Sequence, residues 1–228
     1  MGQDRKSGKG DTDGDAVREP SQAERTRQDI LEVATREFAE KGYSGARIDE
    51  IAALTSTTKR AIYYHYESKQ GLFIAVLENA YRGIRALEAT LDLDHLEPAD
   101  SIRTLAGFTF DYQWAHADFV RLVMVENIHH GAHLEAAVSL RNVNVPILDA
   151  VHRVYARGVA TGVFRPGIEP IDIHMTISAL AFFNVSNRFT FSRIFDHDLG
   201  DPAIRAARRS VVIDTVLRFL QADAPAAG

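Results

Sequence analysis

Apolar residues recur at helical spacing along most of the chain beyond its first twenty residues. Ile30, Leu31, Ala34 and Phe38 lie one, three and four residues apart, a spacing that places side chains on one face of an α-helix. Gly42 follows where this face ends and is typical of a helix C-terminus. The sequence carries neither an alternating strand pattern nor an internal repeat. The pattern therefore predicts an all-α protein.

Nine helices are expected from these apolar faces and from the Gly, Pro and Asp positions between them. The third is predicted to begin at Thr58, whose hydroxyl suits an N-cap, and Ser68 is predicted to cap the fourth. The fourth runs to about Leu91, and the other expected spans are about 22–41, 47–54, 99–116, 118–130, 133–160, 170–194 and 203–221. Two short helices in a tight turn, flanked by longer helices, form a helix-turn-helix arrangement.

The expected organisation has a small N-terminal domain and a larger helical bundle. Residues 1–20 are rich in Gly, Asp, Lys, Arg and Ser and are predicted to be a disordered tail. The helix-turn-helix domain is expected over residues 21–72, followed by an effector-binding and dimerisation bundle over residues 73–221. A second disordered tail is expected over residues 222–228.

Composition narrows the class of protein. The chain has 228 residues, 46% of them hydrophobic, a formal net charge of −5 and no cysteine, so disulfides, thiolate zinc sites and cysteine nucleophiles are excluded. The N-terminal residues lack the apolar core of a secretory signal, and no apolar run approaches the roughly 20 residues of a membrane span. We therefore expect a cytoplasmic protein without membrane contact. The acidic balance leaves room for a local basic face.

Such a face is predicted in the stretch TTKRAIYYHYESK, residues 57–69, which holds three cations, three tyrosines and a histidine. In a helix-turn-helix the second helix enters the major groove with its first turn nearest the bases, where Lys and Arg can donate to guanine. The residues expected to face base edges are Thr58, Lys59, Arg60 and Tyr64. The residues expected to contact phosphates are Arg47, Tyr63, His65 and Lys69. The alternative, that the tyrosines only pack, is preferred for Tyr66, which shares a face with Ile62.

The stretch GYSGARIDEIAALTSTTKRAIYYHYESKQGLF, residues 42–73, resembles the DNA-binding domain of the TetR family of bacterial repressors. The resemblance covers roughly residues 22–72. It implies an all-helical homodimer that binds a palindromic DNA operator and releases it when a small molecule enters the C-terminal domain. The chain departs from the family pattern at Arg60, which replaces a frequent Gly, and at Ala61, which replaces a frequent phosphate-contacting Thr. Activator and repressor look alike at this level.

The C-terminal half concentrates aromatic residues and interleaved amides, as a small-molecule pocket requires. The expected ligand-binding residues are Phe110, Trp114, Asn127, His130, Asn184, Asn187 and Arg188. An equally weighted alternative is that the aromatics fill the core and the amides lie at a subunit interface. The runs VMVENIHHGAHL and ALAFFNVSNRFTFSRIF loosely resemble the pyrimidine-responsive TetR regulators, which implies an aromatic or heterocyclic effector.

The last two expected helices carry small and aliphatic residues on one side. In proteins that this chain resembles, the final two helices pair with those of a second copy, and such a contact supplies the two-fold symmetry of a palindromic site. The residues expected on this side are Ile173, Ile177, Leu180, Ala181, Ile204, Val211, Val212, Thr215, Leu217 and Leu220.

Glu126, His129, His130 and His133 are spaced as metal ligands on a continuous helix would be, but Gly131 interrupts that helix. We therefore expect no metal, no cofactor and no catalytic residue, and a protein that is not an enzyme. Two alternatives stay open from the sequence. One is a metalloenzyme built on this cluster, and the other is an effector-binding or protein-interaction module whose helix-turn-helix no longer reads DNA.

Overall fold

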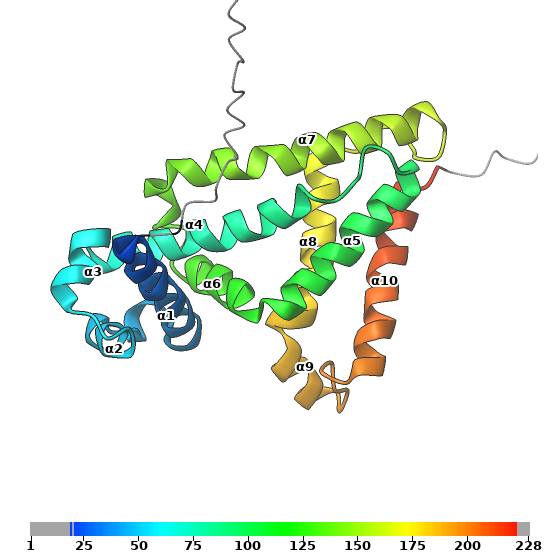
Figure 1. The fold of residues 1–228 in the computed structure, drawn as a ribbon. Helices are drawn as coiled ribbons and strands as arrows, with labels where there is room; N and C mark the ends of the chain where they lie inside the picture. The colour runs from blue at the N-terminus through cyan, green and yellow to red at the C-terminus, as the bar shows by residue number, and fades with distance from the viewer. Residues whose placement is uncertain (1–18, 20, 223–228) are drawn as a thin grey trace, which may run out of the picture.

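The computed structural model describes residue 19 and residues 21–222, and the regular elements of this part of the chain are helices joined by turns and short loops (Figure 1). The predictions for the two tails fall almost entirely outside the described residues. The elements are α1 (Gln22–Gly45), α2 (Ile48–Leu54), α3 (Lys59–Tyr66), α4 (Lys69–Glu88), α5 (Pro98–Ala115), α6 (Ala117–Ile128), the 3-10 turn η1 (Leu134–Ala136), α7 (Val138–Ala160), α8 (Pro170–Ser186), α9 (Arg188–Ile194) and α10 (Pro202–Leu220). The all-α prediction is confirmed.

Three of the N-terminal helices, α1, α3 and α4, begin at residues whose side chains cap them. Ser21 and Glu24 form a capping box at the start of α1, which satisfies backbone N–H groups that have no partner within the helix. The Thr58 hydroxyl accepts the Ala61 N–H at 3.1 Å, and the Ser68 hydroxyl accepts the Gly71 N–H at 2.9 Å. These local bonds fix where α3 and α4 start, as predicted.

Gly42 interrupts α1, as its position in the sequence indicates. Its φ of 70° and ψ of 173° break the regular helix, a conformation that glycine adopts without a steric cost. A short turn over residues 43–45 then leads into α2, so the last residues of α1 lie beyond a kink.

Two predicted helices are divided in the structure. The span 170–194 splits at Asn187, whose φ of −102° and ψ of 6° leave the helical range between α8 and α9. The predicted helix 133–160 begins only at Val138, because the backbone turns through His130 and Gly131, both with positive φ. The described residues therefore contain ten α-helices and one 3-10 turn, where nine helices were expected.

The hydrophobic core joins the N-terminal helices to the bundle. One cluster combines residues of α1–α4 with Leu122 on α6 and Leu140 on α7. A second cluster lies between α5, α7, α8 and α10. α4 reaches from α3, at the left of Figure 1, to the centre of the bundle. The helix-turn-helix therefore rests on the bundle over an extensive apolar contact.

Half of the residues expected on the side of α8 and α10 that meets a second copy are buried within a single chain. Ile173, Ile177, Ala181, Val212 and Leu220 are buried in the core of a single chain. The expectation that these residues contact a partner is therefore wrong. Sequence spacing marks an apolar face, but it does not say which of two apolar faces of a helix packs inside.

Membrane insertion was not expected from the sequence. None of the described helices combines the length and the apolar character needed to cross a bilayer.

Candidate nucleic-acid interface

α3 is anchored by its inner face. Ile62 and Tyr66 are buried, and the Tyr66 hydroxyl donates to the Arg27 carbonyl on α1 at 2.8 Å. The prediction that Tyr66 packs beside Ile62 is confirmed. Because Tyr66 reaches across to α1, it fixes the rotation of α3 about its axis and so decides which residues face outward.

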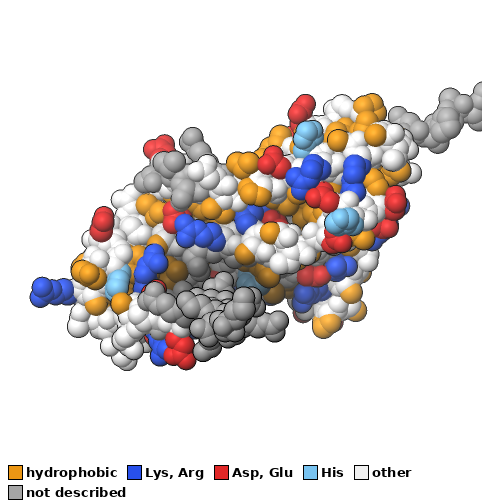
Figure 2. Space-filling model, turned by 45° about the horizontal axis from the view of Figure 1, so that its top comes forward, with side chains coloured by type: hydrophobic (Ala, Val, Ile, Leu, Met, Phe, Trp, Pro, Cys, Tyr) orange, Lys and Arg blue, Asp and Glu red, His pale blue; other side chains and the backbone are white. Residues whose placement is uncertain are grey.

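The outer face of α3 presents cations and aromatic hydroxyls to solvent. Lys59 and Arg60 are exposed in the first turn, and Tyr63 and Tyr64 are 44% and 83% exposed. The two tyrosines lie next to each other and next to the two cations, so they form part of one exposed patch. In Figure 2, Lys and Arg side chains stand out at the end of the molecule that holds α2 and α3. The face combines hydrogen-bond donors with stacking surface, as a nucleic-acid interface requires.

Asp49, in the first turn of α2, is the nearest acidic neighbour of this face. It forms an ion pair with Lys59 and lies 3.9 Å from Arg47. All three side chains are well exposed, so the pairs are weak in water and are readily exchanged for phosphate. Asp49 holds the two cations near each other at the start of α2 and α3.

Lys69 is more constrained than the other predicted contacts. Its Nζ donates to the Ser44 carbonyl at 3.4 Å and lies 5.0 Å from the centre of the Tyr43 ring. Burial lowers the pKa of the Lys69 ammonium. This cation stands at the first residue of α4, where the helix dipole favours an anion. The His65 ring lies half-buried between Tyr64 and Tyr66.

The seven predicted ligand-binding residues lie in two places. Asn127 and His130 are at the end of α6 and in the turn that follows. The other five lie where α5, α8, α9 and α10 approach one another. Here two guanidinium groups approach the Trp114 ring. The centre of the ring lies 5.4 Å from Cζ of Arg188 and 5.2 Å from Cζ of Arg205.

The individual contacts at this second place are those of a packed interior. Phe110 is fully buried with Ala181 and Val212. The Asn184 side chain donates to the Leu180 carbonyl at 2.7 Å and accepts from Arg208 at 3.1 Å. None of the five predicted residues at this place lines the hollows beside α4.

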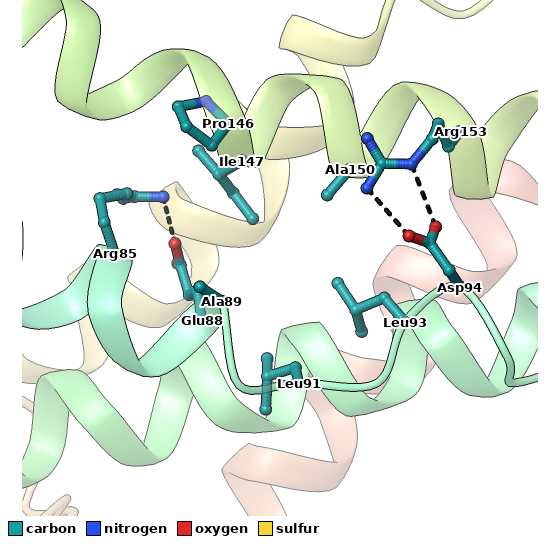
Figure 3. A pocket seen from close by; sticks show the side chains of 10 residues that line it. All are labelled: Arg85, Glu88, Ala89, Leu91, Leu93, Asp94, Pro146, Ile147, Ala150 and Arg153. Carbon is teal, nitrogen blue, oxygen red and sulfur yellow. Dashed lines mark hydrogen bonds and ion pairs between the residues drawn. The ribbon is translucent and has the colours of Figure 1, made fainter. Parts of the chain in front are cut away.

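The two larger hollows beside α4 have other linings. The first, of about 240 Å³, lies between α4, the segment after it and α7, and Figure 3 shows its lining. The second, of about 550 Å³, lies between α4, the η1 turn, α7 and α8, and is more open. Its lining residues include Tyr81, His130, Asn144 and His174. Of the predicted ligand-binding residues, His130 lines the second of these hollows, and Asn127 lines a smaller hollow of about 50 Å³ between α4 and α6.

A buried ion pair that was not predicted from the sequence lines the first hollow. Arg85 Nη1 donates to Glu88 Oε2 at 2.5 Å, and the two side chains are 12% and 3% exposed. A signal was present, since Glu88 continues the apolar stripe of Leu77 and Ile84 at helical spacing. A carboxylate at a core position of a helix indicates either a buried partner or a ligand.

Burial sets the protonation of this ion pair and its surroundings. It raises the pKa of Glu88 to about 7, and Arg85 opposes part of that rise. Burial, and then the nearby Arg85 charge, lower the pKa of His174 to about 4, so this imidazole is neutral near pH 7. Burial also raises the pKa values of the Tyr81 and Tyr112 phenols.

The Glu126–His133 segment has a structural role. The buried Glu126 carboxylate accepts the His133 N–H at 2.9 Å, the Leu134 N–H at 3.1 Å and His133 Nδ1 at 2.7 Å. The His133 ring packs 4.4 Å from Tyr43 and 4.9 Å from Phe73, measured between ring centres. Within the described residues, no three His, Cys, Asp or Glu side chains are placed to hold a metal ion. Glu126 closes the turn that rests against the helix-turn-helix.

A cationic, aromatic recognition helix on an all-helical bundle with internal hollows defines a helix-turn-helix DNA-binding regulator. Two family models match the chain. "Bacterial regulatory proteins, tetR family" matches residues 30–76, and "Tetracyclin repressor-like, C-terminal domain" matches residues 98–216. The chain belongs to the TetR family of transcriptional regulators, whose members matched here are regulators and not enzymes.

Relatives and solved structures agree with this assignment. The chain is 36% identical over 200 residues to the transcriptional repressor NicS of Pseudomonas putida, covering 88% of this chain and 94% of that protein. It is 37% identical over 117 residues to the repressor SCO4008 of Streptomyces coelicolor, covering 51% and 55%. Among structures, the regulator SCO4942 of Streptomyces coelicolor superimposes with a TM-score of 0.64 at 28% identity, covering 86% and 98%. A tetR-family protein of Rhodococcus RHA1 gives 0.68 at 22% identity, covering 90% and 100%.

Proposed function

We propose that the protein is a repressor that binds a palindromic operator as a homodimer and releases it when a small effector occupies the C-terminal domain. The observation that carries the proposal is the outer face of α3, where Lys59, Arg60, Tyr63 and Tyr64 are exposed while Ile62 and Tyr66 anchor the helix. The name of the relative NicS, a repressor, favours repression over activation. We assign DNA binding to residues 21–72 and effector binding and dimerisation to residues 73–221.

The contacts divide by their position on α3 and its neighbours. Lys59 and Arg60 occupy the first turn of α3, which enters the major groove deepest, and Thr58 and Tyr64 flank them. The Thr58 hydroxyl oxygen accepts the Ala61 N–H, and its hydroxyl hydrogen is free to donate to DNA. Contacts to phosphate are assigned to Arg47, Tyr63, His65 and Lys69. Because Lys69 is already held against Tyr43 and Ser44, it loses little side-chain entropy on binding.

Arg60→Ala is expected to weaken binding to the preferred operator by roughly 1 to 3 kcal/mol and to relax sequence preference at one symmetric position. The preferred operator is first obtained by selecting random duplexes on the purified protein, and affinities are then measured across a salt series. Lys69→Gln should instead weaken all sequences alike and reduce the salt dependence by about one phosphate contact.

Arg82→Ala is the matched control, because Arg82 is an exposed cation on α4 that pairs with Glu78 away from α3. Its operator affinity should equal that of the wild type. Enrichment of no motif at all would contradict sequence-specific binding and favour the alternative of a helix-turn-helix that no longer reads DNA.

The outward faces of α8 and α10 support pairing with a second copy. On α8, Ile171, Met175 and Phe183 are exposed at helical spacing, and on α10 Val211 is exposed. Small residues, Ala203 and Ala207, lie on the same side of α10 as Val211 and are also exposed. An apolar face next to small residues allows close helix packing across a two-fold axis.

Met175→Asp is expected to convert the protein to a monomer at micromolar concentration, because it buries a charge in the middle of the proposed interface. Light scattering coupled to size-exclusion chromatography measures the mass. Ile128→Asp is the control, since Ile128 is also exposed but lies on α6. A Met175→Asp protein that keeps the mass of the wild type would place the interface elsewhere.

α4 connects the two activities. Its first residue, Lys69, lies beside α3, and its last turn holds Arg85 and Glu88 on the first hollow. A ligand that moves the end of α4 therefore changes the separation of the two recognition helices, which a palindromic site sets at about 34 Å. By linkage, the effector and the operator must weaken each other's binding by the same factor.

A further inference from the structure

The hollow between α4 and α7 has two charged ends and apolar walls (Figure 3). Arg85 and Glu88 lie at one end, and Asp94 and Arg153 form an ion pair at the other, with Arg153 Nη2 3.0 Å from Asp94 Oδ2. The side chains between the two pairs are Ala89, Leu91, Leu93, Pro146, Ile147 and Ala150. The ends differ in burial, because the Asp94–Arg153 pair is about half exposed and the Arg85–Glu88 pair is not.

One edge of the Arg85 guanidinium is unused. Its bond to Glu88 is made by Nη1, and Nε is buried with no hydrogen-bond partner. In a planar guanidinium the Nε–H and one Nη2–H point in parallel, away from Nη1. Neither atom donates to any group in the described part of the chain. Nε has almost no accessible surface, so Nη2 is the donor left for a ligand oxygen, and arginine favours a carboxylate there.

Glu88 is suited to this arrangement because one of its oxygens is also free. Oε1 is buried and has no hydrogen-bond partner, and burial raises the pKa of Glu88 to about 7. When Glu88 is protonated, no negative charge remains beside Arg85 at its end of the cavity. An incoming carboxylate then restores neutrality, and His174 nearby stays uncharged.

The volume and walls limit the remainder of the ligand. A cavity of about 150 Å³ is large enough for benzene, so the hollow of about 240 Å³ holds one six-membered ring with a substituent. The apolar side chains of Leu91, Pro146 and Ile147 in the lining favour an apolar ring.

We propose that this cavity binds a small carboxylic acid with a single apolar ring, its carboxylate on the Arg85 guanidinium and its ring between α7 and the segment after α4. This inference rests on the proposed function and names the class of its effector. Binding of such an acid weakens the ion pair between Arg85 and Glu88. Because both residues lie in the last turn of α4, the ligand acts on that turn.

The test measures benzoate binding to the full-length protein by calorimetry, without DNA, with benzamide as the neutral molecule of the same shape. Benzoate is expected to bind at least tenfold more tightly than benzamide at pH 6. Arg85→Met should reduce benzoate affinity at least thirtyfold, while Arg153→Met, at the other end of the cavity, should change it less than threefold. Thermal melts establish that each variant is folded.

Glu88→Gln provides a second variant that does not remove the guanidinium. In the wild type, benzoate affinity should fall about tenfold from pH 6 to pH 8, because Glu88 loses the proton that binding requires. Glu88→Gln should keep the pH 6 affinity at both values. The other groups around Glu88 are Arg85, Tyr81, Tyr112 and His174, and Asp94 and Arg153 face it across the cavity. Burial raises the pKa values of the Tyr81 and Tyr112 phenols and lowers the pKa of His174 to about 4. None of these three groups therefore changes its charge between pH 6 and pH 8.

Three results would overturn the inference: equal binding of benzamide, unchanged binding by a folded Arg85→Met protein, or no binding of benzoate or cyclohexanecarboxylate at about 10 mM. Operator binding is measured separately. Loss of operator recognition with intact benzoate binding would count against the proposed function alone, and the reverse would count against the cavity alone.

Discussion

Gly71→Ala is expected to lower the free energy of unfolding by about 2 to 3 kcal/mol and to weaken operator binding in the fraction that folds. A Cβ at Gly71 would lie 2.2 Å from the carbonyl oxygen of Tyr66 and 3.3 Å from its carbonyl carbon. Because Tyr66 is the last residue of α3, relief of this overlap requires α3 to move away from α4. Overpacking against backbone costs roughly this much. Urea denaturation and the operator titration measure the two effects.

Gly45→Ala is the matched control. Its Cβ would meet only the Lys41 Cβ at 3.3 Å, a contact that a shift of a few tenths of an ångström relieves. We expect a change below about 0.5 kcal/mol in unfolding and unchanged operator affinity. If Gly71→Ala behaved like Gly45→Ala, the close approach of α4 to the end of α3 would not exist in solution.

Glu126→Ala is expected to cost about 3 kcal/mol or more in the free energy of unfolding. The Glu126 carboxylate accepts two backbone N–H groups and the Nδ1 of His133, so its removal leaves three donors at a buried turn without a partner. Each unsatisfied buried donor costs roughly 1 to 3 kcal/mol, although relaxation and water recover part of the sum. Urea denaturation followed by circular dichroism measures the change.

The neighbouring residue provides the control for Glu126. Asn127 makes one bond, from its side chain to the Val123 carbonyl, and is exposed, so Asn127→Ala should change stability by less than about 0.5 kcal/mol. A metal site at Glu126 and its histidines predicts a different result, since wild-type protein would then lose stability on treatment with a chelator. Equal stability of Glu126→Ala and the wild type would contradict the structural role.

The N-terminal half was predictable because its determinants are local. Thr58 and Ser68 cap helices through bonds to residues three positions on, and the spacing of Ile62 and Tyr66 alone assigns their face. Gly42 breaks α1 through its own φ. Such features depend on a few neighbouring residues, so they can be derived from the order of side chains without knowledge of the remainder of the fold.

The cavity was not predictable in the same way because it depends on contacts between distant helices. Phe110 and Trp114 have the chemistry of a pocket wall, yet α8 and α10 cover the first and two arginines cover the second. Arg85 and Glu88, which do line a hollow, lie three residues apart on α4, and the apolar stripe that Glu88 continues indicates its burial but not the hollow beside it. Only the packing of α7 over α4 distinguishes the two cases.

The continuous core beneath α1–α4 restricts how this protein can be recombined with its relatives. Leu122 and Leu140 belong to the bundle by sequence but pack with the helix-turn-helix, and His133 does so through Tyr43 and Phe73. A chimera that exchanges only residues 21–72 would place a foreign surface against these side chains. To transfer operator specificity to another sensor domain, the contacting positions of α6, η1 and α7 must therefore be exchanged together with the DNA-binding helices. The unit that can be transferred is thus discontinuous in sequence.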